Sequence, residues 1–239
     1  MLFTPEMSGL LDANRERAAG SVRSEGDDAV LPAVREAAKA SGIWVHLGSL
    51  AVRTSDAKLA NRAFVIDPSG AIVGRYDKMH LFDVDLPTGE SWRESATYEA
   101  GGVPVVVRGT PVGTLGLTIC YDLRFPAIFE RLSEAGVNVI AVPAAFTVPT
   151  GKAHWHVLLR ARAIEAGLFV VAAAQSGRHE DGRETFGHSL VVDPWGEVLM
   201  DGGEGQKLLF ADIDLSTIAE VRSRIPVLRH RRTVGPVSN

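Results

Sequence analysis

The sequence predicts an α/β protein made of two similar halves whose sheets pack against each other. Helix-like stretches alternate with short apolar strands, and Gly, Pro, Asp or Ser stands at most junctions between them. A helix, a strand and an Asp-Pro-x-Gly hairpin follow one another in the first half, and the same order recurs in the second. Because apolar strands need cover on both faces, two such halves pack best sheet against sheet, with their helices outside.

The first half begins with an amphipathic helix predicted over residues 28–40 from the helical spacing of its apolar residues. A strand is predicted over 43–47. The stretch 63–73 is predicted to form a hairpin, because Pro68 and Gly70 occupy positions that a tight turn requires.

The second half repeats this order with a helix predicted over 153–166, a strand over 168–174 and a hairpin over 189–199. Near the end of the chain, apolar residues in the segment 218–225 predict a further helix, followed by a tail over about 226–239. This helix and tail could cross to a second subunit, but an ordinary surface helix explains the pattern nearly as well.

Composition limits the classes of protein that the chain can belong to. Its 239 residues, 46% of them hydrophobic, can bury a sizeable core as a single domain over 1–239. A formal net charge of −4 excludes the basic surface expected for binding nucleic acid or an anionic membrane. No window reaches the ~20 apolar residues of a membrane span, and the first ten residues lack the cations of a signal peptide. We therefore expect a cytoplasmic protein.

The single cysteine, Cys120, follows an apolar, β-branched run and precedes a charged turn. A lone thiol excludes an internal disulfide, and a free cysteine is more often a small buried hydrophobe than a nucleophile. A thiol at a strand end is nevertheless a candidate nucleophile. Because an ordinary thiol has a pKa of about 8.5, it would need a base or a cation nearby.

Three other segments carry charged residues that could serve such a thiol. Glu6 ends a short apolar run at the start of the chain, and Lys78 stands just past a strand-like run. Glu94 lies in a predicted loop beside Trp92. Taken singly, each would be interpreted as an ordinary surface charge.

Together these segments resemble the motifs of the nitrilase superfamily of carbon–nitrogen hydrolases, and the resemblance covers nearly the whole chain. It rests on Pro5-Glu6, Asp77-Lys78-Met-His-Leu81, Arg93-Glu94-Ser95, Cys120-Tyr-Asp-Leu-Arg-Phe-Pro126, Pro143-Ala-Ala-Phe-Thr147, the run 150–165, Val170-Val-Ala-Ala-Ala-Gln175 and Gly187-His-Ser-Leu-Val-Val-Asp-Pro-Trp-Gly196. The later blocks are similar to the branch that contains the deaminated glutathione amidases. Any one block is weak evidence, but all of them in this order are specific.

The resemblance implies a four-layer α-β-β-α sandwich, in agreement with the element pattern. It also implies a mechanism in which Glu6 accepts the Cys120 thiol proton and Lys78 stabilises the thiolate. The thiolate attacks an amide carbonyl, and Lys78 and the Tyr121 backbone N–H hold the oxyanion. Glu6 then protonates the leaving ammonia and activates the water that hydrolyses the thioester. Glu94 orients either Lys78 or that water.

The resemblance to amidases also implies a small amide substrate that bears a carboxylate. Arg124 matches a family arginine that meets a carboxylate, and Phe146 and Thr147 are further candidate substrate contacts. Deaminated glutathione is the first candidate substrate, with ω-amidase, N-carbamoyl-amino-acid hydrolase and nitrilase activities as alternatives. His156 departs from the glutamate expected at this position, which leaves the exact substrate open. The polar, glycine-rich loop 176–183 could form a substrate rim or a solvated turn.

The chain departs from the family pattern at its start, since Met1 falls inside the expected second strand. A full-length relative would place roughly 25 to 35 residues, the first strand and helix, before Glu6. A late start codon or a real truncation would explain this departure. Two alternatives therefore stand beside the amidase: an inactive fragment or binding protein, and a thiol hydrolase that uses His80 or His188 as its base.

No cofactor is expected, and no metal-ligand motif is present in the sequence. His154 and His156 stand two apart on a predicted helix, so they point to different sides and cannot easily share a metal. The expected partner is a small-molecule amide. Relatives in the superfamily commonly dimerise through helices, which implies a homodimer or a higher homo-oligomer.

Overall fold

The computed structural model describes residues 1–12, 14–54, 58–86 and 89–237. The strands are β1 (Leu2–Phe3), β2 (Val45–Arg53), β3 (Leu59–Ile66), β4 (Ile72–Asp77), β5 (Asp83–Asp85), β6 (Ser91–Arg93), β7 (Val105–Thr110), β8 (Gly113–Leu117), β9 (Val139–Ala141), β10 (Phe169–Ala172), β11 (Ser176–Arg178), β12 (Glu184–Phe186), β13 (Leu190–Val192) and β14 (Val198–Asp201). The helices are α1 (Arg15–Ala19), α2 (Val30–Ser41), α3 (Pro126–Glu134), α4 (Val148–Ala166), α5 (Ser216–Arg224) and α6 (Val227–His230), with 3-10 turns η1 (Glu94–Ala96) and η2 (Cys120–Arg124).

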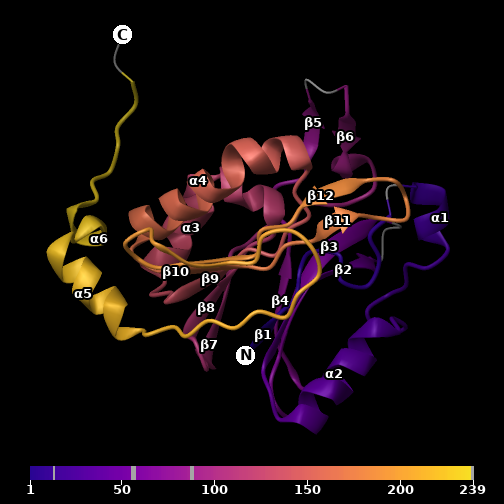
Figure 1. The fold of residues 1–239 in the computed structure, drawn as a ribbon, viewed down its shortest axis with the longest axis horizontal. Coiled ribbons are helices and arrows are strands. Elements are labelled where there is room, and N and C mark those ends of the chain that lie inside the picture. Colours follow the sequence, from indigo (N-terminus) through magenta and orange to yellow (C-terminus); the bar gives the residue numbers. More distant parts are fainter. Residues whose placement is uncertain (13, 55–57, 87–88, 238–239) are drawn as a thin grey trace.

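Two sheets form the centre of the molecule (Figure 1). One has four strands in the order β1-β2-β3-β4, and the other has six in the order β14-β13-β10-β9-β8-β7. Helix α2 covers the outer face of the first sheet, while α3 and α4 cover the second (Figure 1). A large hydrophobic cluster joins residues of both sheets, among them Val65 and Leu117. The predicted α-β-β-α sandwich is therefore confirmed.

The predicted elements of the first half are confirmed, with small changes at their ends. Helix α2 begins where the Asp28 carboxylate accepts the N–H groups of Val30 and Leu31, and ends at Gly42, whose φ of 63° suits glycine. Strand β2 begins at Val45 and runs to Arg53, beyond the predicted 43–47. The hairpin over 63–73 is the β3–β4 turn, in which Gly70 has a φ of 82°.

In the second half, helix α4 begins at Val148 rather than at Ala153, because Pro149 is tolerated in a first helical turn. The predicted strand over 168–174 is β10, and the hairpin over 189–199 is β13–β14. The predicted loop around Glu94 was wrong in part, since Ser91–Arg93 pairs with β5 and Glu94 begins the 3-10 turn η1.

The C-terminal helix predicted from residues 218–225 is α5, which packs Ile218 into the core. The predicted tail over 226–239 contains the short helix α6, and residues 238–239 of that tail lie outside the described residues. Within the described ranges, the structure contains no helix long and apolar enough to cross a membrane.

The two-residue period of the strands brings polar side chains between the sheets. On β3, Phe64 packs in the cluster beneath α2, whereas Ala63 and Val65 pack in the cluster between the sheets. Asn61 lies on the same face as Ala63, and it is completely buried. Lys78 follows β4 with the parity of Tyr76, so it points toward this inter-sheet layer as well.

Candidate active site

The structure brings together the four residues predicted to carry the chemistry. Glu6 lies in the turn after β1, Lys78 directly after β4, Glu94 at the start of η1 and Cys120 at the start of η2. Lys78 Nζ lies 3.0 Å from Glu6 Oε1 and 2.9 Å from Glu94 Oε2. The Cys120 thiol shares a hydrogen bond with the Glu6 carboxylate. Glu6, Lys78 and Cys120 are buried, with exposed fractions of 5%, 2% and 8%.

Cys120 stands at a sharp bend between β8 and the turn η2. Its φ of 49° lies in the left-handed region, which is unfavourable for a residue with a Cβ. The Cys120 N–H donates to the Pro143 carbonyl over 2.9 Å, and the next turn begins with a bond from the Asp122 N–H to the Ile119 carbonyl. Along the chain, the Tyr121 N–H follows the first of these N–H groups and precedes the second.

Asp122 holds this bend in place from a completely buried position. Its Oδ2 accepts the Ile119 N–H at 2.8 Å and the Tyr76 hydroxyl at 2.7 Å. Its Oδ1 lies 3.0 Å from the His80 N–H and 2.7 Å from His80 Nδ1. Burial, and then the charge of Asp122, raise the pKa of Tyr76, so its hydroxyl stays a donor.

Replacing Asp122 by asparagine is expected to destabilise the fold by about 1–3 kcal/mol. Each carboxylate oxygen accepts one backbone N–H, so an amide NH2 on either side must face a donor. Urea unfolding of the two proteins would measure the loss. Asp214→Asn is the control, because Asp214 is an exposed residue before α5; an equal loss in both variants would contradict the role of Asp122.

Further hydrogen-bond donors fix the two carboxylates that bind Lys78. Glu6 Oε1 accepts Asn61 Nδ2 at 2.9 Å, and Glu6 Oε2 accepts the Ala145 N–H at 2.9 Å. Glu94 Oε2 accepts the Phe82 N–H at 2.6 Å, while Glu94 Oε1 lies 3.1 Å from Lys78 Nζ. With both carboxylates fixed in this way, the Lys78 ammonium has little freedom to move.

Burial and charge set the protonation of the three groups. Burial alone would raise the pKa of Glu6, but the Lys78 charge and hydrogen bonds from Cys120, Lys78 and Asn61 lower it further than burial raises it. Burial works against the Lys78 charge, yet Glu6 and Glu94 raise its pKa well above the ordinary value. Burial, then the Glu6 charge, raise the pKa of Cys120 well above its usual range. The resting site therefore holds a neutral thiol, an ionised Glu6 and a charged Lys78.

A cavity of about 470 Å³ opens over Glu6, Lys78 and Glu94. Arg53 and Arg183 bring positive charge to its wall, and the Arg183 guanidinium lies 5.2 Å from the centre of the Trp92 ring. Arg183 comes from the polar loop over 176–183, which forms the hairpin β11–β12. Its position favours the substrate-rim interpretation of that loop over the solvated turn.

Cys120 faces a smaller hollow of about 20 Å³, and Phe82 and Ala145 line both spaces. The three predicted substrate contacts, Arg124, Phe146 and Thr147, line this hollow with Cys120. The Arg124 guanidinium lies 5.4 Å from the Phe146 ring centre, and its Nη1 lies 3.2 Å from His154 Nδ1. The structure thus places all the predicted site residues around two adjoining spaces.

The two histidines considered as alternative bases each pair with a carboxylate other than Glu6. His80 bonds to Asp122 and stacks on Phe125 with ring centres 3.7 Å apart. His188 bonds to Asp201. Since the thiol bonds to Glu6, the geometry favours Glu6 over either histidine as its base.

Three contributors were missing from the sequence-based prediction: Asn61, the Ala145 N–H and Gln175, whose Nε2 donates to the Glu6 carbonyl at 3.0 Å. A signal for Asn61 exists, because it is the polar member of an inward-facing alternation with Ala63 and Val65. No comparable signal exists for a backbone N–H.

The fold and the site together define the class of protein. It is an α-β-β-α sandwich that holds a thiol, a carboxylate and an ammonium group in one buried site. Residues 1–223 match the model of the carbon-nitrogen hydrolase family. The chain is 41% identical to a "Deaminated glutathione amidase" of Yersinia enterocolitica over 98% of its own length and 82% of that protein. Relatives of that name from bacteria, Dictyostelium and mammals also match, and the chain spans 61% to 82% of their length.

Solved structures of related proteins superpose on this chain. The NitFhit protein of C. elegans superposes with a TM-score of 0.88 at 39% identity, covering 97% of this chain and 57% of that one. An amidase from Nesterenkonia superposes with a TM-score of 0.79 at 26% identity, covering 97% of this chain and 80% of that one. In that amidase the acetamide moiety of fluoroacetamide is attached to the active-site cysteine. The chain belongs to the carbon–nitrogen hydrolase family.

Proposed function

We propose that this protein hydrolyses a small amide bearing a carboxylate to the acid and ammonia, through a thioester on Cys120. The observation that carries the proposal is the buried thiol hydrogen-bonded to Glu6, whose carboxylate is paired with Lys78 at the edge of a cavity. A thiol, a base and a fixed cation are the groups that acyl transfer requires.

The first step needs a proton acceptor for a thiol that is neutral at rest. The raised pKa of Cys120 argues against a preformed thiolate, so the proton passes to Glu6 as sulfur attacks the carbonyl carbon. The S–C bond forms while the carbonyl π electrons move onto oxygen. Glu6 then gives its proton to the amide nitrogen, the C–N bond breaks and ammonia leaves.

The Lys78 ammonium and the Tyr121 N–H stabilise the oxyanion in this scheme. Glu94 binds Lys78 through both carboxylate oxygens, which fits the role of orienting the lysine. In the second half of the reaction, Glu6 takes a proton from water as the hydroxide attacks the thioester, and then returns it to the departing sulfur.

The names of the relatives and the charges near the thiol suggest the substrate class. The relatives in bacteria and mammals are named deaminated glutathione amidases. Arg124 beside Cys120, with Arg53 and Arg183 on the larger cavity, suits a substrate with more than one carboxylate. Deaminated glutathione has this character, and α-ketoglutaramate and N-carbamoyl amino acids are the alternatives.

The test is ammonia release by the purified chain from these amides, with intact-protein mass spectrometry during turnover. Because the chain has one cysteine, an acyl adduct that iodoacetamide pre-treatment prevents lies on Cys120. We expect ammonia and acid in equal amounts and a block by pre-alkylation. Turnover that survives full alkylation would contradict the thioester. A folded chain that releases no ammonia would favour the binding-protein alternative.

Replacing Glu6 by glutamine is expected to lower kcat/KM about 10²–10⁴-fold, because the base is lost while the shape remains. The assay is ammonia release from the preferred amide. His80→Gln is the comparison, since His80 is one of the two alternative bases and bonds to Asp122 rather than to Glu6. A larger loss in His80→Gln than in Glu6→Gln would favour the Cys-His alternative.

Replacing Arg124 by methionine is expected to raise KM about 10-fold or more for a carboxylate-bearing amide, as one charge-assisted contact is lost. A neutral amide of similar size is the control substrate, and its KM should change little. An equal rise for both amides would indicate that Arg124 only shapes the hollow with Phe146.

A homodimer and a cytoplasmic location stay predictions. Sedimentation equilibrium of the purified chain would measure its oligomeric state directly.

A further inference from the structure

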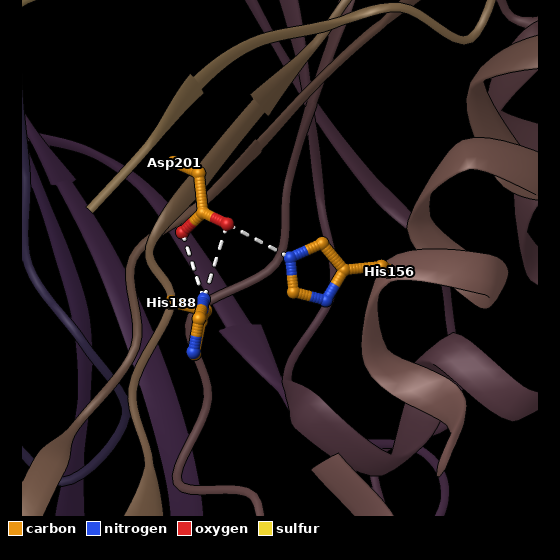
Figure 2. Close-up of side chains that lie close together, drawn as sticks. All are labelled: His156, His188 and Asp201. Atoms are coloured by element: carbon orange, nitrogen blue, oxygen red, sulfur yellow. Dashed lines mark hydrogen bonds and ion pairs between the residues drawn. The ribbon is translucent and has the colours of Figure 1, made fainter. Parts of the chain in front are cut away.

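A second cluster of ionisable groups lies at the surface, formed by His156, His188 and Asp201 (Figure 2). His156 comes from helix α4, His188 from the connection between β12 and β13, and Asp201 from the end of β14. The proposed reaction gives these residues no task. We propose that His156, His188 and Asp201 bind a divalent transition-metal ion of the zinc class, as a clip that joins these three segments.

The distances within the cluster fit a metal ion with little movement. One ligand atom from each residue lies within 4.8 Å of the others. His156 Nε2 is 2.9 Å from Asp201 Oδ2, and His188 Nδ1 is 2.9 Å from Asp201 Oδ1. Ligands of a tetrahedral zinc ion, at 2.0–2.1 Å from the metal, stand about 3.3 Å apart. Small outward shifts of the two rings would therefore admit the ion.

The donor set selects the class of metal. Two imidazoles and one carboxylate suit zinc, cobalt or nickel, whereas magnesium and calcium prefer oxygen ligands alone. At neutral pH the carboxylate is charged and offsets part of the charge of the ion. The His156, His188 and Asp201 side chains are 36%, 24% and 35% exposed, so an ion can enter and water can complete its coordination.

Contacts around the cluster hold the ligands in the required orientation. Asp201 Oδ1 accepts the Gly203 N–H at 2.8 Å, which fixes the carboxylate. The His188 ring stacks on Phe186 with centres 4.4 Å apart, and the His188 carbonyl accepts Trp155 Nε1 at 2.7 Å. A pre-oriented set of this kind needs little reordering to bind metal.

The position of the cluster explains what binding would do to the protein. The three ligands come from segments that are distant in sequence, and the ion would cross-link them. Metal that binds only the folded state raises its stability, and a hundredfold excess over Kd corresponds to a Tm increase of about 5–10 °C for a chain of this size.

The experiment uses the full chain with Cys120→Ala, so that the thiol cannot take up metal. Calorimetric titration with ZnCl2 should show one ion per chain, and CoCl2 should give the visible absorption of a four-coordinate cobalt ion. Adding His156→Ala or Asp201→Asn should weaken zinc binding at least 10-fold. It should also remove both the cobalt spectrum and the zinc-dependent Tm increase. Addition of MgCl2 should change none of these readouts.

His154→Ala in the same background is the matched control, because His154 lies on α4 but pairs with Arg124. It should bind zinc as tightly as the parent. Circular dichroism without metal checks the folding of each variant, and Asp201→Asn, which nearly keeps the side-chain shape, provides the result if His156→Ala unfolds. The proposal is overturned if no saturable binding occurs, or if His156→Ala and Asp201→Asn bind zinc as tightly as the parent does.

Discussion

Cys120→Ala is expected to reduce ammonia release below detection while leaving the fold intact. Cys120 is the only cysteine, and in the proposed reaction its sulfur forms the covalent bond. Removal of a nucleophile in a comparable acyl-transfer enzyme costs about 10⁶-fold in kcat. The residual rate, from Lys78 and substrate binding alone, should fall below detection in an ammonia assay.

The control for this variant is its stability. The side chain is small, and both residues must adopt the positive φ found at position 120, so we expect the melting temperature to change little. Cys120→Ser tests the chemistry more finely, because a hydroxyl keeps the hydrogen bond to Glu6 but is the poorer nucleophile. Ammonia release by Cys120→Ala at a rate near that of the parent would refute the thioester mechanism.

The sequence allowed Glu6, Lys78 and Cys120 to be chosen because each stands at a strand end within a motif. Residues distant in sequence meet where strand ends of two stacked sheets adjoin, so motif and fold together predict their proximity. The pKa directions were not predictable in the same way. The pKa of the Cys120 thiol is raised by its burial and by the Glu6 charge, and only the packed structure reveals these two causes.

The residues that sequence analysis missed act through the tertiary structure. The Ala145 N–H has no side-chain signature, and Gln175 contributes through a bond to the Glu6 backbone. The same limit explains why the sequence did not predict the surface cluster of His156, His188 and Asp201. His156 stands near His154 on helix α4, and the two side chains do point apart, but the partners of His156 in the cluster, His188 and Asp201, lie in other segments.

The buried charges also determine how much stability and activity are lost when a residue of the site is replaced. Glu6 and Glu94 are two carboxylates held close by one ammonium, and Lys78 is the cation to which both bond. Removal of a single carboxylate leaves an ion pair behind. Removal of Lys78 leaves two like charges in a region of low dielectric, so we expect stability and activity to depend most steeply on this residue.

Lys78→Met is expected to destabilise the fold by about 3–5 kcal/mol and to lower kcat/KM by at least 10²–10³-fold. Methionine nearly matches the length of the lysine stem, so the loss comes from the ammonium rather than from an empty space. Without that charge, the pKa of Glu6 should rise, because burial then acts on it with less opposition. Urea unfolding and ammonia release would measure the two effects.

The double variant Lys78→Met/Glu94→Gln separates the causes of these effects. Removing the charge of Glu94 relieves the repulsion, so stability should recover in part, whereas activity should not, because the oxyanion still lacks its cation. Lys58→Met is the control for the loss of a cation, because Lys58 is an exposed lysine directly before β3. Recovery of activity together with stability would show that Lys78 serves the fold alone, and the oxyanion would then need another donor.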